Sequence, residues 1–135
     1  MRVVVTGTRG YIGVEMVPAL RAAGHEVIGL DTGLFDECDF LSPPDEIPTM
    51  RVDLRDVTPE HLKRVDAVVH LAALSNDPLS DLNPSITYEV NLHASVRLAK
   101  AAKEAGVRRF LFSSSCSLYG RAGRDTWTRA PPSIR

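Results

Sequence analysis

The sequence predicts an α/β protein built on a doubly wound parallel sheet with helices on both faces. Short runs rich in β-branched residues alternate along the chain with segments of helical spacing. This alternation is typical of parallel strands joined by helices that cover the sheet. The length of 135 residues, with 44% hydrophobic and 24% charged residues, suits one domain with a single core. We expect five strands in the order 3-2-1-4-5.

The first part of the chain supplies three of these strands. Residues 2–7 form a β-branched run closed by a glycine, and residues 11–25 have the spacing of a helix. Residues 26–31 read as the second strand. After a loop rich in proline and acidic residues, residues 50–56 alternate in polarity like a third strand.

The second part supplies the remaining two strands. Residues 58–65 predict a short helix with Thr58 as its N-cap, and residues 66–73 predict the fourth strand. Residues 80–106 contain a long helix that ends at a glycine, and residues 107–115 form the fifth strand.

Composition and charge exclude several classes of partner. The net charge of −1 provides no basic field for nucleic acid or for an anionic membrane. No apolar run approaches the length of a membrane span, and the N-terminal run is too short for a signal peptide. Two cysteines are too few for a disulfide framework. We therefore expect a cytoplasmic protein with reduced thiols, no nucleic acid and no membrane.

The turn after the first strand has the glycine spacing of a dinucleotide-binding loop and reads GTRGYIG from Gly7 to Gly13. Its glycines let the backbone approach a pyrophosphate, which the amides and dipole at the following helix start attract. A tight turn without a ligand is the alternative. Asp31, at the end of the second strand, favours the dinucleotide, because a carboxylate accepts both ribose hydroxyls and repels a 2′-phosphate. This predicts NAD rather than NADP, although the charge of Arg9 would tolerate the extra phosphate.

Five segments together resemble the extended short-chain dehydrogenases/reductases, and among these the NAD-dependent epimerase/dehydratase family that includes UDP-glucose 4-epimerase. In order, they are VVVTGTRGYIG, GLDTG, VDLRD, VVHLAALS and YEVNLHASVRLAKAAKEAGVRRFLFSSSCSLYG. The resemblance covers residues 1–120. It implies a Rossmann domain with NAD as cofactor and, in the full-length family, a nucleotide sugar as substrate.

The resemblance also implies a role for individual residues. The cofactor-binding residues that it implies are Gly7, Gly10, Tyr11, Ile12, Gly13, Asp31, Asp53, Leu54, Leu71, Ala72, Ala73, Asn91, Ser113 and Ser114. Among these, Asp53 and Leu54 match the pair that holds the adenine ring, and Asn91 matches a helix asparagine that steadies the active site. Ser115 matches the catalytic serine or threonine, which hydrogen-bonds the sugar oxygen being oxidised.

Each of these residues also has a purely structural interpretation. The serines can satisfy backbone groups at a strand end, and Asn91 can pack inside its helix. The four histidines show no metal-ligand spacing, so we expect no metal and a structural role for His70. Cys116 has no base beside it in the sequence, which favours a packed thiol.

The chain departs from the family pattern after Tyr119. The family's reaction requires Tyr-x-x-x-Lys, but Tyr119 is followed four positions later by Gly123, and no lysine lies beyond Lys103. Tyr119 matches a structural Tyr-Gly instead. We expect a fold truncated after the fifth strand that is inactive alone, with a non-enzymatic NAD-binding sensor or regulatory module as the alternative. The family is often homodimeric, and its dimer helices would be incomplete here.

Residues 121–135 differ in character from residues 1–120. They carry four arginines against one aspartate, and the family usually has an acidic, proline-containing run at this place. Trp127 has the single codon TGG and Thr128 begins with AC, so the neighbouring frame must encode aspartate there. That frame can encode the expected family form. We hypothesise an out-of-frame tail, with a truncation or a natural tail as alternatives.

Overall fold

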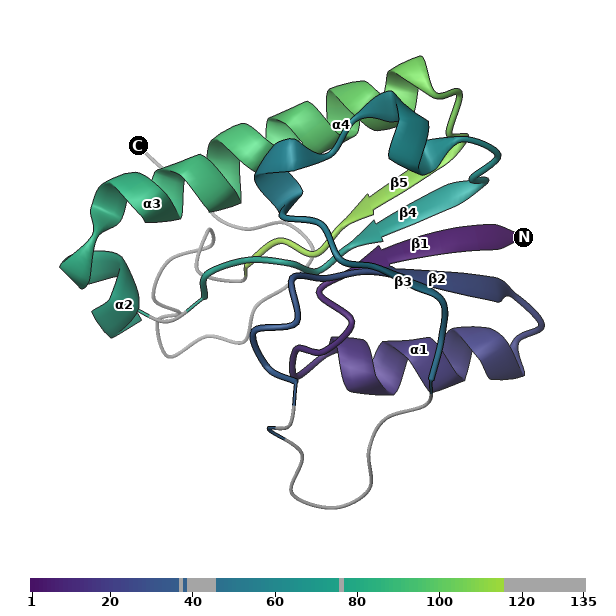
Figure 1. Cartoon of the computed structure of the whole chain (residues 1–135), viewed down its shortest axis with the longest axis horizontal. Helices are drawn as coiled ribbons and strands as arrows, with labels where there is room; N and C mark the ends of the chain where they lie inside the picture. The colour runs from purple at the N-terminus through teal and green to yellow at the C-terminus, as the bar shows by residue number, and fades with distance from the viewer. Residues whose placement is uncertain (37, 39–45, 76, 116–135) are drawn as a thin grey trace, which may run out of the picture.

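The computed structural model describes residues 1–36, 38, 46–75 and 77–115 (Figure 1). One parallel sheet with the order β3-β2-β1-β4-β5 forms its centre, which confirms the predicted doubly wound α/β class and strand order. The strands are β1 (Arg2–Thr6), β2 (Glu26–Leu30), β3 (Thr49–Met50), β4 (Ala67–His70) and β5 (Arg109–Phe112).

Helices cover both faces of this sheet. Figure 1 shows α1 (Gly13–Ala22) below it and α4 (Ser95–Glu104) above it. Two 3-10 turns, η1 (Leu54–Asp56) and η2 (Pro59–Leu62), connect β3 to β4. This placement follows from the strand sequences, because alternate residues of a buried strand face opposite layers.

The long helix predicted within residues 80–106 is present but is not uniform. It runs through α3 (Pro84–Tyr88), the π-helical segment η3 (Glu89–Ala94) and α4, and a separate short helix, α2 (Asp77–Leu82), precedes it. The predicted end at a glycine is confirmed, since Gly106 has a φ of 77°. A π-helical turn often lies at a functional site.

The prediction of a strand over residues 50–56 is wrong beyond Met50. β3 ends there, and η1 follows after Asp53. The Asp53 carboxylate accepts a hydrogen bond from the backbone N–H of Arg55 at 2.8 Å, so a local side-chain cap replaces the strand ladder. The helix predicted for residues 58–65 is the short 3-10 turn η2, with Thr58 at its N-cap as expected.

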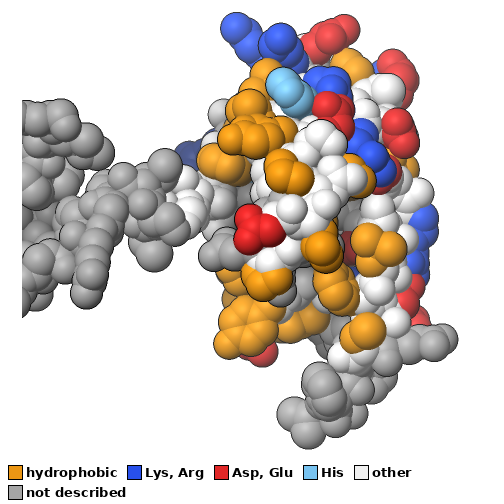
Figure 2. Space-filling view, turned by 90° about the vertical axis from the view of Figure 1, so that its left-hand side faces the viewer, with side chains coloured by type: hydrophobic (Ala, Val, Ile, Leu, Met, Phe, Trp, Pro, Cys, Tyr) orange, Lys and Arg blue, Asp and Glu red, His pale blue; other side chains and the backbone are white. Residues whose placement is uncertain are grey.

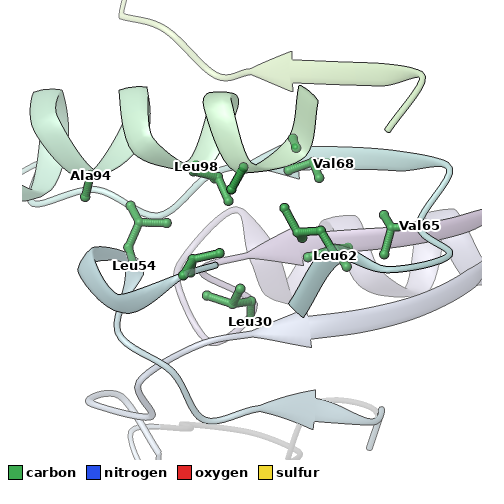
Figure 3. Packing of buried hydrophobic residues seen from close by; sticks show 11 residues of the cluster. Leu30, Leu54, Leu62, Val65, Val68, Ala94 and Leu98 are labelled. Carbon is green, nitrogen blue, oxygen red and sulfur yellow. The ribbon is translucent and has the colours of Figure 1, made fainter. Parts of the chain in front are cut away.

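Two buried hydrophobic clusters hold the layers together. In β1, Val4 belongs to the cluster under α4, whereas Val3 and Val5 belong to the cluster over α1. Figure 3 shows the first cluster, in which Leu98 of α4 and Leu62 of η2 are fully buried. The inner strands are therefore apolar on both faces, as a parallel sheet requires.

Strand β5 differs from the inner strands. It pairs with β4 in the described part of the chain, and all four of its residues are exposed. Leu111 and Phe112 are 52% and 57% exposed. The carboxyl ends of all five strands point to the same edge of the sheet, on the left of Figure 1.

Candidate functional site

The turn between β1 and α1 is built around glycine. Gly7 has a φ of 73°, and its N–H donates to the carbonyl of Leu30 at 3.0 Å. A Cβ atom at Gly13 would lie 2.2 Å from the carbonyl oxygen of Gly7, so a side chain there would open the turn. The first amides of a helix have no partner inside it, and those of Tyr11 and Ile12 lie at this start. The turn can therefore offer N–H groups and a positive dipole to an anion.

Asp31 ties this turn to the end of β2. Its Oδ2 accepts the backbone N–H of Arg9 at 2.9 Å, and its Oδ1 accepts the backbone N–H of Gly33 at 2.8 Å. The residue is 9% exposed. Each carboxylate oxygen keeps acceptor capacity, which suits a ligand hydroxyl placed over the turn.

A buried polar network lies at the carboxyl end of β4. His70 is 1% exposed, and its Nδ1 lies 2.7 Å from the hydroxyl of Thr6 while its Nε2 lies 2.8 Å from the hydroxyl of Ser95. The Thr6 oxygen also accepts the backbone N–H groups of Leu71 and Ala72, both at 3.1 Å. Burial lowers the pKa of His70 from 6.5 to about 4, so the ring is neutral.

This network places the segment 71–73 beside the glycine turn. A Cβ atom on Gly7 would lie 3.0 Å from the backbone of Ala72. His70 therefore has a structural role, as expected: through Thr6 it helps to hold residues 71–73, the segment predicted to line the cofactor. Sequence reasoning did not identify Thr6, because a threonine within a buried β-branched strand gives no signal of what its hydroxyl will contact.

Asn91 holds the next residue of that loop. Its Oδ1 accepts the N–H of Leu74 and its Nδ2 donates to the carbonyl of Leu74, both at 2.8 Å. Asn91 lies in the π-helical segment η3. The oxygen and the nitrogen of one carboxamide therefore both restrain the loop after β4.

Asp53 and Leu54, the two residues predicted to hold the adenine ring, lie in different environments. The side chain of Leu54 is 5% exposed and packs in the core under α4. The Asp53 carboxylate is partly exposed, and its hydrogen bond with the Arg55 guanidinium lowers the pKa of that carboxyl. Asp53 therefore stays ionised at the start of η1.

The three predicted serines follow β5 at the carboxyl edge. The N–H of Ser113 donates to the carbonyl of His70 at 3.1 Å, which continues the pairing of β4 with β5. Ser113, Ser114 and Ser115 are all exposed. Cys116, Tyr119 and the tail 121–135 lie outside the described residues.

The other predicted residues lie along one edge of the sheet, where its five neighbouring strands end. Leu54 packs in the core, and Asn91 reaches the loop after β4 from η3. Figure 2 views this side and shows several groups of hydrophobic side chains separated by other atoms, with one acidic side chain among them and most other charged side chains toward the top and right. Tyr11 is 95% and Ile12 50% exposed. Exposed hydrophobic side chains at this edge can contact a ligand or another protein surface.

Other site types receive no support within the described residues. No group of three or more His, Cys, Asp or Glu side chains there could hold a metal. No helix in that part of the chain is long and apolar enough to span a bilayer. Cys38 is a free, exposed thiol.

Comparison with known proteins gives one consistent family. The NAD dependent epimerase/dehydratase family matches residues 3–133. A UDP-glucose 4-epimerase of Neisseria meningitidis serogroup B is 33% identical over 97% of this chain and 41% of its own length.

Solved structures agree. The UDP-glucose 4-epimerase of Thermus thermophilus in complex with NAD has a TM-score of 0.82 and 33% identity, covering 98% of this chain and 44% of that one. A dTDP-glucose 4,6-dehydratase from Streptomyces venezuelae with NAD bound has a TM-score of 0.81 and 31% identity, covering 98% and 45%. The chain spans less than half the length of these three proteins.

Proposed function

Because the chain belongs to the NAD-dependent epimerase/dehydratase family, we propose that residues 1–120 are the NAD-binding domain of a nucleotide-sugar epimerase or dehydratase. The observation that carries this proposal is the position of Asp31. Its carboxylate is held by the N–H groups of Arg9 and Gly33, at 2.9 and 2.8 Å, directly beside the glycine turn. A carboxylate at the end of the second strand is where the adenosine ribose of NAD binds in this fold.

The residues present fit such a dinucleotide. No side chain extends over the turn from Gly7, Gly10 or Gly13, and the amides of Tyr11 and Ile12 lie at the N-terminal end of α1. In this proposal they bind the pyrophosphate, while the free lone pairs of Asp31 accept the ribose hydroxyls.

The other end of the cofactor would lie along the loops after β4 and β5. In this proposal Leu71, Ala72 and Ala73 line it, and Ser113 and Ser114 flank its nicotinamide. NAD, when bound, supplies the acceptor for a hydride from the sugar. In this proposal the hydroxyl of Ser115 hydrogen-bonds the sugar oxygen.

We propose further that the 135-residue chain binds NAD without turning over a nucleotide sugar. The family's proton transfer needs a tyrosine whose pKa is lowered by a lysine four positions later. In this sequence none of the three tyrosines is followed by lysine at that spacing. These 135 residues therefore do not contain the family's Tyr-x-x-x-Lys base.

Calorimetry with NAD tests the site directly. We expect saturable binding to the wild-type chain and at least tenfold weaker binding to Asp31→Asn, which retains the shape of the side chain but loses one ribose acceptor. Glu60→Gln, which removes an exposed carboxylate paired with Lys63, serves as the matched control and should bind NAD normally. Equal NAD affinity in all three proteins would contradict the proposed site.

A turnover assay with UDP-glucose separates the enzyme lineage from the NAD-sensor alternative. We expect no turnover by the 135-residue chain and turnover when the neighbouring reading frame is continued downstream of Tyr119. Turnover by the chain alone would contradict the assignment of a missing base. Binding of NAD without turnover in both proteins would favour the sensor.

A further inference from the structure

A second carboxylate, that of Asp36, lies between two guanidinium groups next to Asp31. Its Oδ1 is 3.6 Å from Nε of Arg9, and its Oδ2 pairs with Nη1 of Arg51. The side chains of Arg9 and Asp36 are 27% and 32% exposed, so the pair is largely withdrawn from solvent. Oδ1 of Asp36 is buried and has no hydrogen-bond partner.

The sheet topology brings these side chains together. Arg9 follows β1, Asp36 follows β2 and Arg51 follows β3, and these strands are parallel neighbours. The N–H of Asp36 donates to the carbonyl of Gly33 at 3.1 Å, which folds the loop back toward the strand end. The three charges therefore meet at the carboxyl edge although they are far apart in the sequence.

Gly33 links this cluster to Asp31. Its N–H is bonded to Asp31, and a Cβ atom at Gly33 would lie 1.6 Å from Nη1 of Arg51 and 2.9 Å from Oδ2 of Asp36. The Arg51 guanidinium thus lies over the glycine next to the proposed ribose site. The φ of Gly33 is 80°, a conformation that glycine adopts without strain.

Two arginines at this place would suit a phosphate on the ribose. Guanidinium groups bind phosphate oxygens through paired hydrogen bonds, and an arginine near the ribose accommodates the 2′-phosphate of NADP. Here, however, both arginines already have a carboxylate partner. Asp31 and Asp36 balance Arg9 and Arg51, so no net positive charge remains for the phosphate.

We propose that Asp36 is a specificity-determining residue that excludes NADP by engaging the guanidinium groups of both Arg9 and Arg51. This proposal rests on the proposed NAD site but adds a residue to it. The side chain would act without touching the cofactor's ribose, since its two oxygens face the arginines. Two carboxylates then discriminate against NADP. Asp31 repels the 2′-phosphate, and Asp36 keeps the guanidinium groups of Arg9 and Arg51 from binding that phosphate.

The test is the ratio of the affinities for NADP and NAD, measured by calorimetry at fixed salt. Asp36→Asn retains the shape of the side chain and removes one negative charge. We expect this variant to bind NADP about tenfold more tightly than the wild-type chain, with NAD affinity changed less than threefold. Adding Arg51→Gln to Asp36→Asn should reduce this gain, because only the guanidinium of Arg9 is then released.

Glu60→Gln is the matched control, since it makes the same change in net charge at the exposed pair with Lys63. Its affinity ratio should equal that of the wild-type chain. A gain in the control as large as in Asp36→Asn would overturn the proposal, because the effect would then come from net charge alone.

Melting temperatures of all variants show whether each is folded. If the wild-type chain binds NAD and Asp36→Asn leaves the ratio of NADP to NAD affinity unchanged, the proposed role for Asp36 is wrong, but the proposed NAD site is supported. If the folded wild-type chain binds neither dinucleotide, both proposals are wrong.

Discussion

The hydroxyl of Thr6 lies 2.7 Å from Nδ1 of His70, and this contact defines where the protons of the buried network lie. The Thr6 oxygen accepts two backbone N–H groups, from Leu71 and Ala72, so its own hydrogen is directed to Nδ1. His70 must then carry its proton on Nε2, which donates to the hydroxyl of Ser95 at 2.8 Å. A chain of hydrogen bonds therefore joins β1, the loop after β4 and α4.

Removal of the Thr6 hydroxyl should lower the free energy of unfolding. Thr6→Val has a similar volume but leaves two buried N–H groups and Nδ1 of His70 without a partner, which costs about 2–3 kcal/mol. Thr6→Ser retains the hydroxyl and should cost less than half as much. Urea denaturation measures both values, and equal losses would contradict the hydrogen-bond role. Nitrogen chemical shifts of His70 should show the tautomer protonated on Nε2.

The stability of the fold should fall in mild acid because of His70. Burial lowers the pKa of its ring to about 4 in the folded chain, whereas the unfolded chain has the ordinary value of 6.5. Between these values the unfolded state binds more protons, so the free energy of unfolding falls as the pH drops from 6.5 to 4, by roughly 3 kcal/mol. This contribution is complete above pH 6.5 and gone below pH 4.

His70→Gln provides the comparison for that pH dependence. Its side chain does not titrate, so the stability difference between wild type and variant should shrink as the pH falls from 6.5 to 4. Urea denaturation at several pH values gives this difference. A constant difference over the range would contradict the lowered pKa.

Loss of the Asn91 amide should release the loop after β4. Asn91→Ala removes the two 2.8 Å hydrogen bonds to Leu74 and should lower the free energy of unfolding by about 2 kcal/mol. Amide hydrogen exchange at Leu74 should become at least tenfold faster. Asn83→Ala removes an exposed helix cap and serves as control, because it should leave exchange at Leu74 unchanged.

Two leucines in the continuous helical stretch of η3 and α4 should differ in their contribution to stability. Leu98 is 0% exposed in the core under α4, whereas Leu92 is 49% exposed. Leu98→Ala should lower the free energy of unfolding by about 2–5 kcal/mol through lost burial and a cavity, and Leu92→Ala by less than about 1 kcal/mol. Thermal or urea unfolding of both variants measures this difference. Similar losses in the free energy of unfolding would contradict the assignment of Leu98, but not Leu92, to the core.

The features that local patterns encode could be predicted from the sequence. The five strands and their order follow from apolar runs separated by helices, and the glycine turn with Asp31 follows from spacing. The strand predicted beyond Met50 failed because alternation of polarity does not reveal that Asp53 caps the chain into η1. A local hydrogen bond outweighed the pattern there.

The pairs that depend on sheet register could not be predicted. Asp36 meets Arg9 and Arg51 only because three strand ends are aligned, and Thr6 meets His70 only because β1 and β4 are neighbours. The sequence around each of these residues does not indicate which residue it will contact. The roles of the serines after β5 and of the tail remain predictions.

The close approach of Gly7 to Ala72 has a consequence for how the protein is made. The hydrogen bonds beside it, from Leu71 and Ala72 to Thr6, span 65 and 66 positions of the chain. On the ribosome, the first loop to emerge must therefore wait several seconds of synthesis before the segment that supports it is available. The glycine turn is the first motif of these 135 residues to be translated, yet it cannot reach its final shape until Leu71 and Ala72 have been made.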